Sequence, residues 1–259
     1  MQLDPLAQRG FGSDLRSALV YERGRPGYAS AAADALAAEF GLDADSRVLD
    51  LAAGTGQLSR LFVPLVGSVV AVEPSASMRA VLARRLPSVE GLDGRAERIP
   101  LPDESVDAAV IGSAFHWFDG DAAVAELARV LRPGGGLAVL WNVGLSSDPP
   151  WPEGLEQLVD ELRARALRPA RQSTSGLWRA ALDRAHDRFE PLRVRAIAHE
   201  HALDQEAFVA GVASFSFIGA MPDDERDPVL TRVRALAPHE CVLSMRTECY
   251  WTRRAGPGP

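Results

Sequence analysis

The sequence predicts an α/β fold in which helices cover both faces of a doubly wound, mostly parallel β-sheet. The first indication is a short apolar run, Val48 to Leu51, that leads into a turn containing Gly54 and Gly56. The second is a succession of continuous apolar runs separated by segments with helical periodicity, which is typical of parallel strands buried on both faces. The third is a pair of long strand-like segments, Leu192 to Leu203 and Cys241 to Thr252. Together these features indicate one large α/β unit.

Gly54 and Gly56 lie where a strand must turn sharply into a helix. Because they lack Cβ atoms, they tolerate a positive φ and let a ligand approach the backbone. A second apolar run, 69–72, ends at Glu73, which follows Gly54 by 19 residues. This interval is close to the roughly 20 residues that separate a glycine turn from a ribose-binding carboxylate in a βαβ unit. The order of parts predicts a nucleoside-binding site, with a helix N-terminal acid as the alternative role of Glu73.

Two residues discriminate between the nucleosides that such a site could hold. Ser59 occupies the position at which the dinucleotide fingerprint has its third glycine. Asp50, at the end of the first strand, would repel two phosphate groups and attract a ligand amine. Both residues favour S-adenosylmethionine over a nicotinamide dinucleotide. A dinucleotide-dependent oxidoreductase stays an alternative that a failure to bind NADH would exclude.

The remaining segments place the parts of this site at one edge of the sheet. Apolar spacing predicts helices over 29–40, 75–86 and 121–131, and strands over 106–111 and 137–143. Right-handed crossovers between parallel strands bring the glycine turn, Glu73, Glu97 and residues 113–117 to the carboxyl ends of the strands. We therefore expect the active site at that edge.

Several further segments carry a resemblance to a known family. They are 21–28 (YERGRPGY), 96–107 (AERIPLPDESVD), 115–118 (FHWF) and 131–140 (LRPGGGLAVL). With these residues and the glycine turn, the chain resembles the class I S-adenosylmethionine-dependent methyltransferases over roughly residues 20 to 142. The closest likeness is to a small-molecule branch similar to trans-aconitate methyltransferase. The resemblance implies a seven-stranded Rossmann-like sheet, closed at one edge by an antiparallel pair of strands, and S-adenosylmethionine as cofactor.

The resemblance and the glycine turn together define the candidate site residues. Tyr21 and Arg25 are expected near the methionine end of the cofactor, and Ala96 and Glu97 beside the adenine. The full set of expected cofactor residues is Tyr21, Arg25, Asp50, Ala52, Gly54, Gly56, Glu73, Pro74, Met78, Ala96, Glu97 and Ser113. His116 is the candidate catalytic base, and a packed core histidine is the alternative reading. The expected substrate residues are Trp117, Trp141, Trp151, Ser214 and Phe217, of which the aromatic ones could equally belong to the core.

The chain is expected to form a single domain over residues 1–259, with a cofactor-binding core at 20–145. After Asn142 the pattern changes, and an amphipathic helix with more length than a crossover requires predicts a cap over the site. We assign the cap and substrate elements to 146–185 and 204–236. Residues 214–218 lie at a break in the helical pattern of 204–236.

Composition narrows the class of protein. A net charge of −7 and a pI near 5.3 disfavour nucleic acid as a partner. The chain has no lysine, so Schiff-base chemistry and lysine-dependent phosphate loops are excluded. With only two cysteines, no signal segment and no apolar run long enough to cross a membrane, we expect a cytoplasmic protein without membrane contact. His199 and His201 are expected to face solvent, and no metal is expected because the spacing of closed zinc sites is missing.

These observations favour methyl transfer by in-line displacement at the sulfonium methyl, with an oxygen, nitrogen or carbon atom of a small-molecule acceptor as the nucleophile. A cofactor-binding regulator or scaffold without catalysis is the main alternative, because its nucleoside site would have the same sequence. The sequence leaves the acceptor, the oligomeric state and the pathway open.

Overall fold

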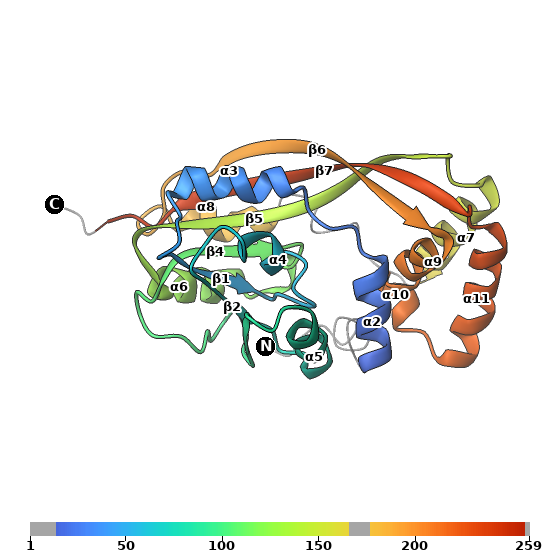
Figure 1. Ribbon diagram of the computed structural model, residues 1–259, viewed down its shortest axis with the longest axis horizontal. Helices are drawn as coiled ribbons and strands as arrows, with labels where there is room; N and C mark the ends of the chain where they lie inside the picture. The colour runs from blue at the N-terminus through green and yellow to red at the C-terminus, as the bar shows by residue number, and fades with distance from the viewer. Residues whose placement is uncertain (1–13, 166–176, 257–259) are drawn as a thin grey trace.

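The computed structural model describes residues 14–165 and 177–256 and contains a seven-stranded sheet (Figure 1). The strand order is β3-β2-β1-β4-β5-β7-β6, and only β7 runs against the others. This arrangement confirms the predicted Rossmann-like, mostly parallel sheet with an antiparallel closing pair. The strands are β1 Arg47–Leu51, β2 Ser68–Val72, β3 Glu90–Leu92, β4 Val106–Gly112, β5 Leu131–Asp148, β6 Arg193–Asp204 and β7 Glu240–Arg253.

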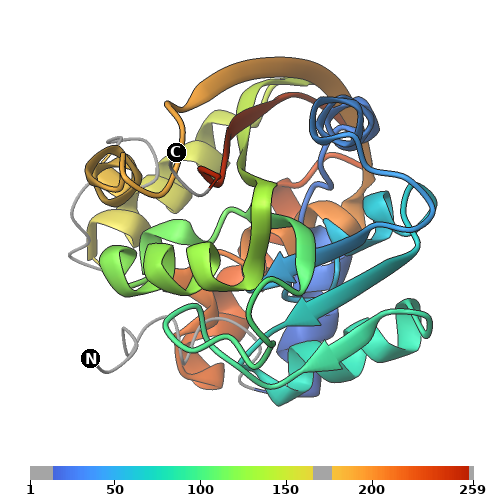
Figure 2. The same cartoon turned by 90° about the vertical axis from the view of Figure 1, so that its left-hand side faces the viewer.

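Helices cover both faces of the sheet, as Figure 2 shows from the side. One face packs on α3, α4 and α5, and the other on α6, α8 and the short turn η1. The helical elements are α2 Leu15–Gly24, α3 Ser30–Phe40, α4 Ser59–Phe62, α5 Ala76–Arg85, η1 Phe115–Trp117, α6 Gly120–Val130, α7 Glu153–Arg165, η2 Leu177–Arg179, α8 Ala180–Arg184, α9 Gln205–Ala213, α10 Ser216–Gly219 and α11 Asp223–Leu236.

Local sequence explains where several of these helices begin and end. The carboxylates of Asp119 and Asp204 accept the N–H groups of Ala122 and Ala207, at the starts of α6 and α9. Helix α3 ends at Gly41, whose φ of 68° is the left-handed conformation that glycine adopts without strain. The predicted helices over 29–40, 75–86 and 121–131 match α3, α5 and α6 within two residues at each end.

The long strands β5, β6 and β7 extend beyond the sheet core and carry a second group of helices (Figure 1). We call α7, α9, α10 and α11 the helical lobe. Its own apolar core includes Leu155, Leu158, Phe208 and Ile218, separate from the two clusters that flank the sheet. Strand β5 was expected over 137–143 only, but it runs to Asp148 because β7 pairs with it along nearly its whole length.

The segment 146–185, expected to be one cap element, divides between two places. Helix α7 packs in the helical lobe. By contrast, Trp178, Ala181 and Leu182 pack with α6 in the core on one face of the sheet. The division arises because β5 carries the chain out to the lobe before α7 begins, and the chain returns to the sheet at η2.

Helix α2 lies between α5 and the helical lobe (Figure 1). Its last residue, Gly24, is pressed against α9: a Cβ added there would lie 2.1 Å from the backbone nitrogen of Gly211. Real Cβ atoms do not approach a backbone so closely, so the two helices can lie at this separation only with glycine at position 24. The contact joins α2 to the lobe.

We expect Gly24→Ala to lower the free energy of unfolding by about 1–3 kcal/mol, because backbone atoms cannot move aside as flexible side chains do. Urea unfolding followed by circular dichroism measures the change. Gly154→Ala in α7 is the matched control, since its Cβ would meet only Leu236 Cδ1 at 3.9 Å, an ordinary contact. Equal stability of the two variants would contradict the tight contact between α2 and α9.

Candidate active site

The glycine turn lies at the carboxyl end of β1, where the sequence predicts a sharp turn. Ala52, Gly54 and Gly56 have φ values of 57°, 58° and 86°. A Cβ at Gly56 would lie 2.8 Å from Leu86 Cδ1, whereas a Cβ at Gly54 would meet no atom within 4 Å. Gly56 therefore allows the turn to pack on α5, and Gly54 borders open space in which a ligand could contact the backbone.

Glu73, at the end of β2, reaches across to this turn. One carboxylate oxygen accepts the N–H of Gly54 at 2.9 Å, and the other accepts the N–H of Ser75 at 2.8 Å. The residue is only 7% exposed. Burial raises its pKa above the ordinary value, although both hydrogen bonds act in the opposite direction.

Asp50 lies in β1, next to the last residue of the strand before the turn, and is only 1% exposed. The hydroxyl of Ser59 donates to its carboxylate at 2.6 Å. This contact explains why serine stands where a dinucleotide fingerprint has glycine. Burial raises the pKa of Asp50 to about 7, and the neighbouring charge of Glu73 contributes in the same direction.

A third buried acid, Glu22 on α2, was not anticipated from the sequence. Its Oε2 accepts the hydroxyl of Thr55 at 2.5 Å and the amide of Gln57 at 3.0 Å. The same amide also donates to the Glu22 carbonyl at 3.2 Å. The sequence did contain a signal for this contact. Thr55 and Gln57 are polar side chains in a turn whose backbone, not its side chains, is expected to contact the ligand.

The three acids surround the turn with few compensating cations. Arg60 and Arg85 approach Glu22 only to 3.9 Å, and both are largely exposed. Arg79 donates to the backbone carbonyl of Glu73 at 2.6 Å and to Asp93, not to the Glu73 carboxylate. A buried carboxylate without a close cation favours a positively charged ligand. The turn is thus suited to a nucleoside that carries a cation.

The residues expected beside the adenine lie along β2, α5 and the loop after β3. Pro74 follows Glu73 and is partly buried, while Met78 is buried against Ala18 of α2. Ala96 is 4% exposed. Glu97 accepts the N–H of Asp119 at 2.9 Å, so it is occupied in fixing the start of α6.

Tyr21 of α2 packs beside Met78, and Arg25, which follows the last residue of the helix, meets the helical lobe. The Arg25 guanidinium lies 5.3 Å from the centroid of the Tyr21 ring and 5.7 Å from that of Phe215. It also donates to the carbonyl of Ser214 at 2.9 Å. Burial raises the pKa of Tyr21, and the Arg25 charge opposes the shift. Arg25 thus connects Tyr21, which is also an expected cofactor residue, to Ser214, an expected substrate residue.

Ser113 follows β4 with a φ of 52°, an uncommon conformation for a residue with a side chain. Its hydroxyl accepts the phenol of Tyr28 at 3.0 Å. Burial raises the pKa of Tyr28, so this phenol stays protonated as a donor. The bond holds the linker between α2 and α3 against the end of β4.

His116 in η1 lies among aromatic rings. Its ring centroid is 4.5 Å from that of Trp117 and 5.3 Å from that of Trp141. It lines a cleft of about 230 Å³ together with Phe115, Phe118, Gly120, Trp178, Ala180, Ala181 and Arg184. The size suits part of a small molecule.

Trp151 and Phe217 lie away from this cleft, within the helical lobe. Trp151 packs edge-on against Phe208 at 5.1 Å between ring centroids. Phe217 stacks on Phe215 at 5.7 Å, with Arg163 5.9 Å from its centroid. Of the expected substrate residues, Trp117 and Trp141 therefore surround His116, Ser214 contacts Arg25, and the remaining two pack in the lobe.

The histidines of β6 differ from the expectation. His199 and His201 are partly buried and face the linker before α3, where His199 Nε2 lies 3.2 Å from the carbonyl of Gly27. Burial lowers the pKa of His201, and the charges of His199 and Arg60 reinforce the shift. They were expected in solvent, but the registry with β7 turns this face of β6 inward. The described residues include no group of three potential metal ligands.

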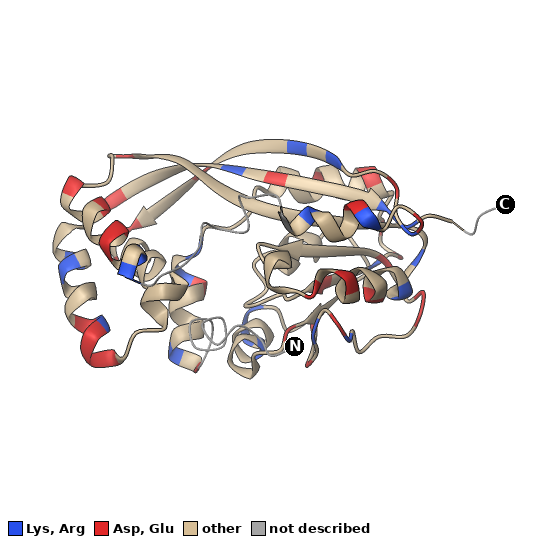
Figure 3. Ribbon diagram, turned by 180° about the vertical axis from the view of Figure 1, so that it is seen from behind, with Lys and Arg blue, Asp and Glu red and all other residues tan. Residues whose placement is uncertain are grey.

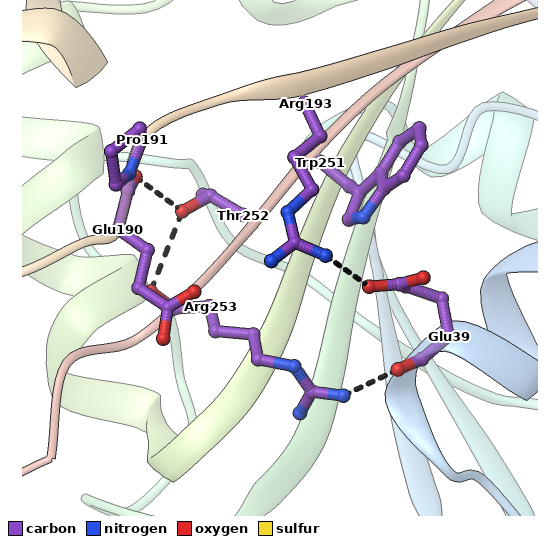
Figure 4. Close-up of a pocket in the computed structure, with 7 residues that line it drawn as sticks. All are labelled: Glu39, Glu190, Pro191, Arg193, Trp251, Thr252 and Arg253. Atoms are coloured by element: carbon purple, nitrogen blue, oxygen red, sulfur yellow. Dashed lines mark hydrogen bonds and ion pairs between the residues drawn. The ribbon is translucent and has the colours of Figure 1, made fainter.

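A small pocket at the other end of the sheet has a structural role. It holds about 10 Å³, at most the volume of a water molecule, and is crossed by the ion pair of Arg193 with Glu39 (Figure 4). Arg253 donates to the backbone carbonyl of Glu39 beside it. These contacts attach α3 to the β6–β7 edge and leave no room for an organic ligand.

Charged residues of both signs are distributed over the described chain. In Figure 3, basic positions are scattered among acidic ones, and a run of acidic positions stands at the start of α11. Within residues 14–165 and 177–256, no helix combines the length and apolar composition needed to cross a bilayer.

Comparisons with known proteins agree with this architecture. A family model described as a methyltransferase domain matches residues 49–139. An uncharacterized methyltransferase of Mycobacterium tuberculosis is 37% identical over 229 residues, covering 86% of this chain and 85% of the relative. A solved structure of a candidate type II methyltransferase from Anaeromyxobacter dehalogenans is 28% identical, with a TM-score of 0.56 over 90% of this chain and 97% of that one. Phosphoethanolamine N-methyltransferase 2 of Haemonchus contortus, solved with S-adenosylhomocysteine, has a TM-score of 0.56 at 15% identity, over 100% of this chain and 61% of that one.

The structure is that of an α/β protein with a glycine turn and buried acids at the carboxyl edge of its sheet. The similarity to the mycobacterial protein extends over most of both chains. The chain therefore belongs to the methyltransferase family. The resemblance to class I methyltransferases is thereby confirmed. The narrower likeness to trans-aconitate methyltransferase and the roles of the individual site residues stay predictions.

Asp50 gives the protein a specific dependence of stability on pH. Its pKa is about 7 when folded and 3.8 ordinarily, so the folded state holds a proton that the unfolded state releases between these values. Stability from this group is complete below pH 4 and is lost as pH rises through 7, by up to about 1.4 kcal/mol per pH unit. Urea unfolding at pH 5 and pH 8 should show this loss without ligand.

Asp50→Asn is the matched control, because its side-chain carbonyl can still accept the Ser59 hydroxyl but does not titrate. The difference in unfolding free energy between the two proteins should change between pH 5 and pH 8 in favour of the variant. A constant difference would show that Asp50 titrates normally.

Proposed function

We propose that the protein transfers a methyl group from S-adenosylmethionine to a small-molecule acceptor by in-line displacement. The observation that carries the proposal is the open glycine turn with buried Asp50 and Glu73 beside it, in a chain of the methyltransferase family. The fold neighbour solved with S-adenosylhomocysteine supports the choice of cofactor.

The residues present fit this cofactor. The space at Gly54, which a Cβ would enter without a clash, suits a ligand lying on the backbone. Glu73 would accept the ribose hydroxyls, and the buried apolar side chains of Ala96 and Met78 would suit an adenine ring. Asp50 would compensate a positive charge, with Tyr21 and Arg25 at the methionine end. The same acids disfavour the phosphates of a dinucleotide, which argues against an oxidoreductase.

S-adenosylmethionine supplies a methyl group on a positively charged sulfur; the acceptor's electron pair forms the new bond while the sulfur keeps the electrons of the broken one. The protein's own contribution is mainly positional. Holding donor and acceptor in line at about 3–3.5 Å supplies several kcal/mol without a covalent intermediate. A ring such as Tyr21 or Trp117 near the positive charge would add about 0.5–2 kcal/mol.

His116 is the residue we propose for the proton of a hydroxyl acceptor. It lines the cleft next to η1, and its ring packs against those of Trp117 and Trp141. An acceptor that is already an anion would need no base. A non-catalytic cofactor-binding protein, the alternative function, would have no use for a histidine held in an open cleft.

The cofactor site is tested by Gly54→Val and Glu73→Ala. We expect Gly54→Val to abolish S-adenosylmethionine binding, because the branched side chain fills the space above the turn and disfavours its positive φ. Glu73→Ala should weaken binding by about 1–3 kcal/mol through loss of charge-assisted hydrogen bonds. Calorimetry measures both affinities. Normal binding by a folded Gly54→Val protein would refute the placement of the site.

The role of His116 is tested by separating chemistry from binding. His116→Ala should lower kcat for a hydroxyl acceptor by about 10²–10⁴-fold and leave cofactor affinity nearly unchanged. The measurement is transfer of a labelled methyl group to acceptors from a metabolite extract, across a pH range. Equal losses in kcat and in cofactor affinity would assign His116 a structural role instead.

A further inference from the structure

One face of the β5–β7 pair, next to η1, carries a connected group of aromatic and charged side chains. Trp141 lies directly opposite Glu248 in the sheet, and Arg246 and Tyr250 share that face of β7. Trp178 bridges them, with its ring centroid 5.6 Å from that of Trp141 and 5.0 Å from that of Tyr250. We call Trp141, Trp178, Arg179, Arg246, Glu248 and Tyr250 the β5–β7 cluster. It joins the His116 cleft, because Trp178 lines both and the His116 ring packs on Trp141.

Several hydrogen-bond donors of this cluster are buried without an acceptor. The indole N–H of Trp141, a side chain only 6% exposed, and the Nε–H groups of Arg179 and Arg246 have no hydrogen-bond partner in the structure. Buried donors are normally paired, so an unpaired set next to an open cleft marks a place for a ligand with hydrogen-bond acceptors.

The charges of the cluster do not cancel. Arg246 is neutralised by Glu248 at 2.6 Å, and the phenol of Tyr250 donates to the same carboxylate at 3.0 Å. Arg179, which lies 5.4 Å from the Tyr250 ring centroid, forms no ion pair with any described residue. One positive charge is left over in a chain of net charge −7. A surplus of this sign on a partly buried side chain beside a cleft favours an anion.

We propose that the β5–β7 cluster is the acceptor pocket and that it takes a planar aromatic anion, a ring that bears a carboxylate or phenolate. The aromatic walls provide the stacking surface, and Arg179 with the Trp141 indole provides the donors. This inference rests on the proposed methyl transfer and deepens it by naming the substrate class. It also adds β7 to the elements that set substrate choice, whereas η2 lies within the segment 146–185 that the sequence already assigned to the cap and substrate elements.

The test uses three probes that separate charge from shape: benzoate, neutral benzamide and non-planar cyclohexanecarboxylate. Calorimetry, with and without S-adenosylhomocysteine, should give benzoate at least about tenfold tighter binding than either of the others. Arg179→Gln should remove that preference, and Arg179→Lys should keep part of it. Trp141→Phe, which retains the ring and loses the N–H, should weaken benzoate by about fivefold. Arg193→Gln, at the distant α3 contact in Figure 4, is the control and should change nothing.

Equal affinity for the three probes, no detectable binding of benzoate, or a benzoate preference that survives both Arg179→Gln and Trp141→Phe would overturn the proposal. Thermal unfolding of each variant confirms that it is folded. Failure of S-adenosylhomocysteine to bind while the benzoate preference holds would count against the proposed function and leave the pocket assignment standing.

Discussion

The burial of acids around the glycine turn is the constraint on which the rest of the site depends. Asp50, Glu73 and Glu22 are all less than a tenth exposed. Each is held by donors from the turn or its helix: the Gly54 N–H, the Thr55 and Ser59 hydroxyls and the Gln57 amide. The turn thus satisfies its acids, and the acids fix the turn in its left-handed conformation. The arrangement stays costly until a cation enters, which is a reason for such a site to bind its ligand strongly.

Helix α2 extends this constraint to the helical lobe. Glu22 attaches the helix to the glycine turn, while Gly24 and Arg25, within one turn of it, contact Gly211 and Ser214 of the lobe. The strands β5 and β7 hold the lobe from the other side. Helix α2 therefore connects the glycine turn to the junction of α9 and α10, although these segments are distant in sequence.

What the sequence predicted well is local. Positive φ at Gly54 and Gly56, the apolar strands and the interval to Glu73 follow from steric preference and periodicity within one βαβ unit. Glu22 could not be found in this way, because its role depends on Thr55 and Gln57, more than 30 residues away. The extension of β5 through exposed Gly144 and Leu145 has no apolar pattern and comes from pairing with β7. The same long-range pairing turned His199 inward and split the expected cap.

Two neighbouring parts of the proposed site favour ligands of opposite charge, and this difference affects the release of the products. The glycine turn is acidic, whereas the β5–β7 cluster has an arginine without a carboxylate partner. On our proposal the donor is a cation and the acceptor an anion, and methyl transfer removes one charge of each sign. The cofactor product then carries one positive charge less beside the buried acids, and Arg179 loses its counter-ion. Both products are held less strongly than the substrates they come from, because interactions with charged partners are the stronger ones in a buried site. On this proposal, the loss of charge in methyl transfer itself favours the release of both products.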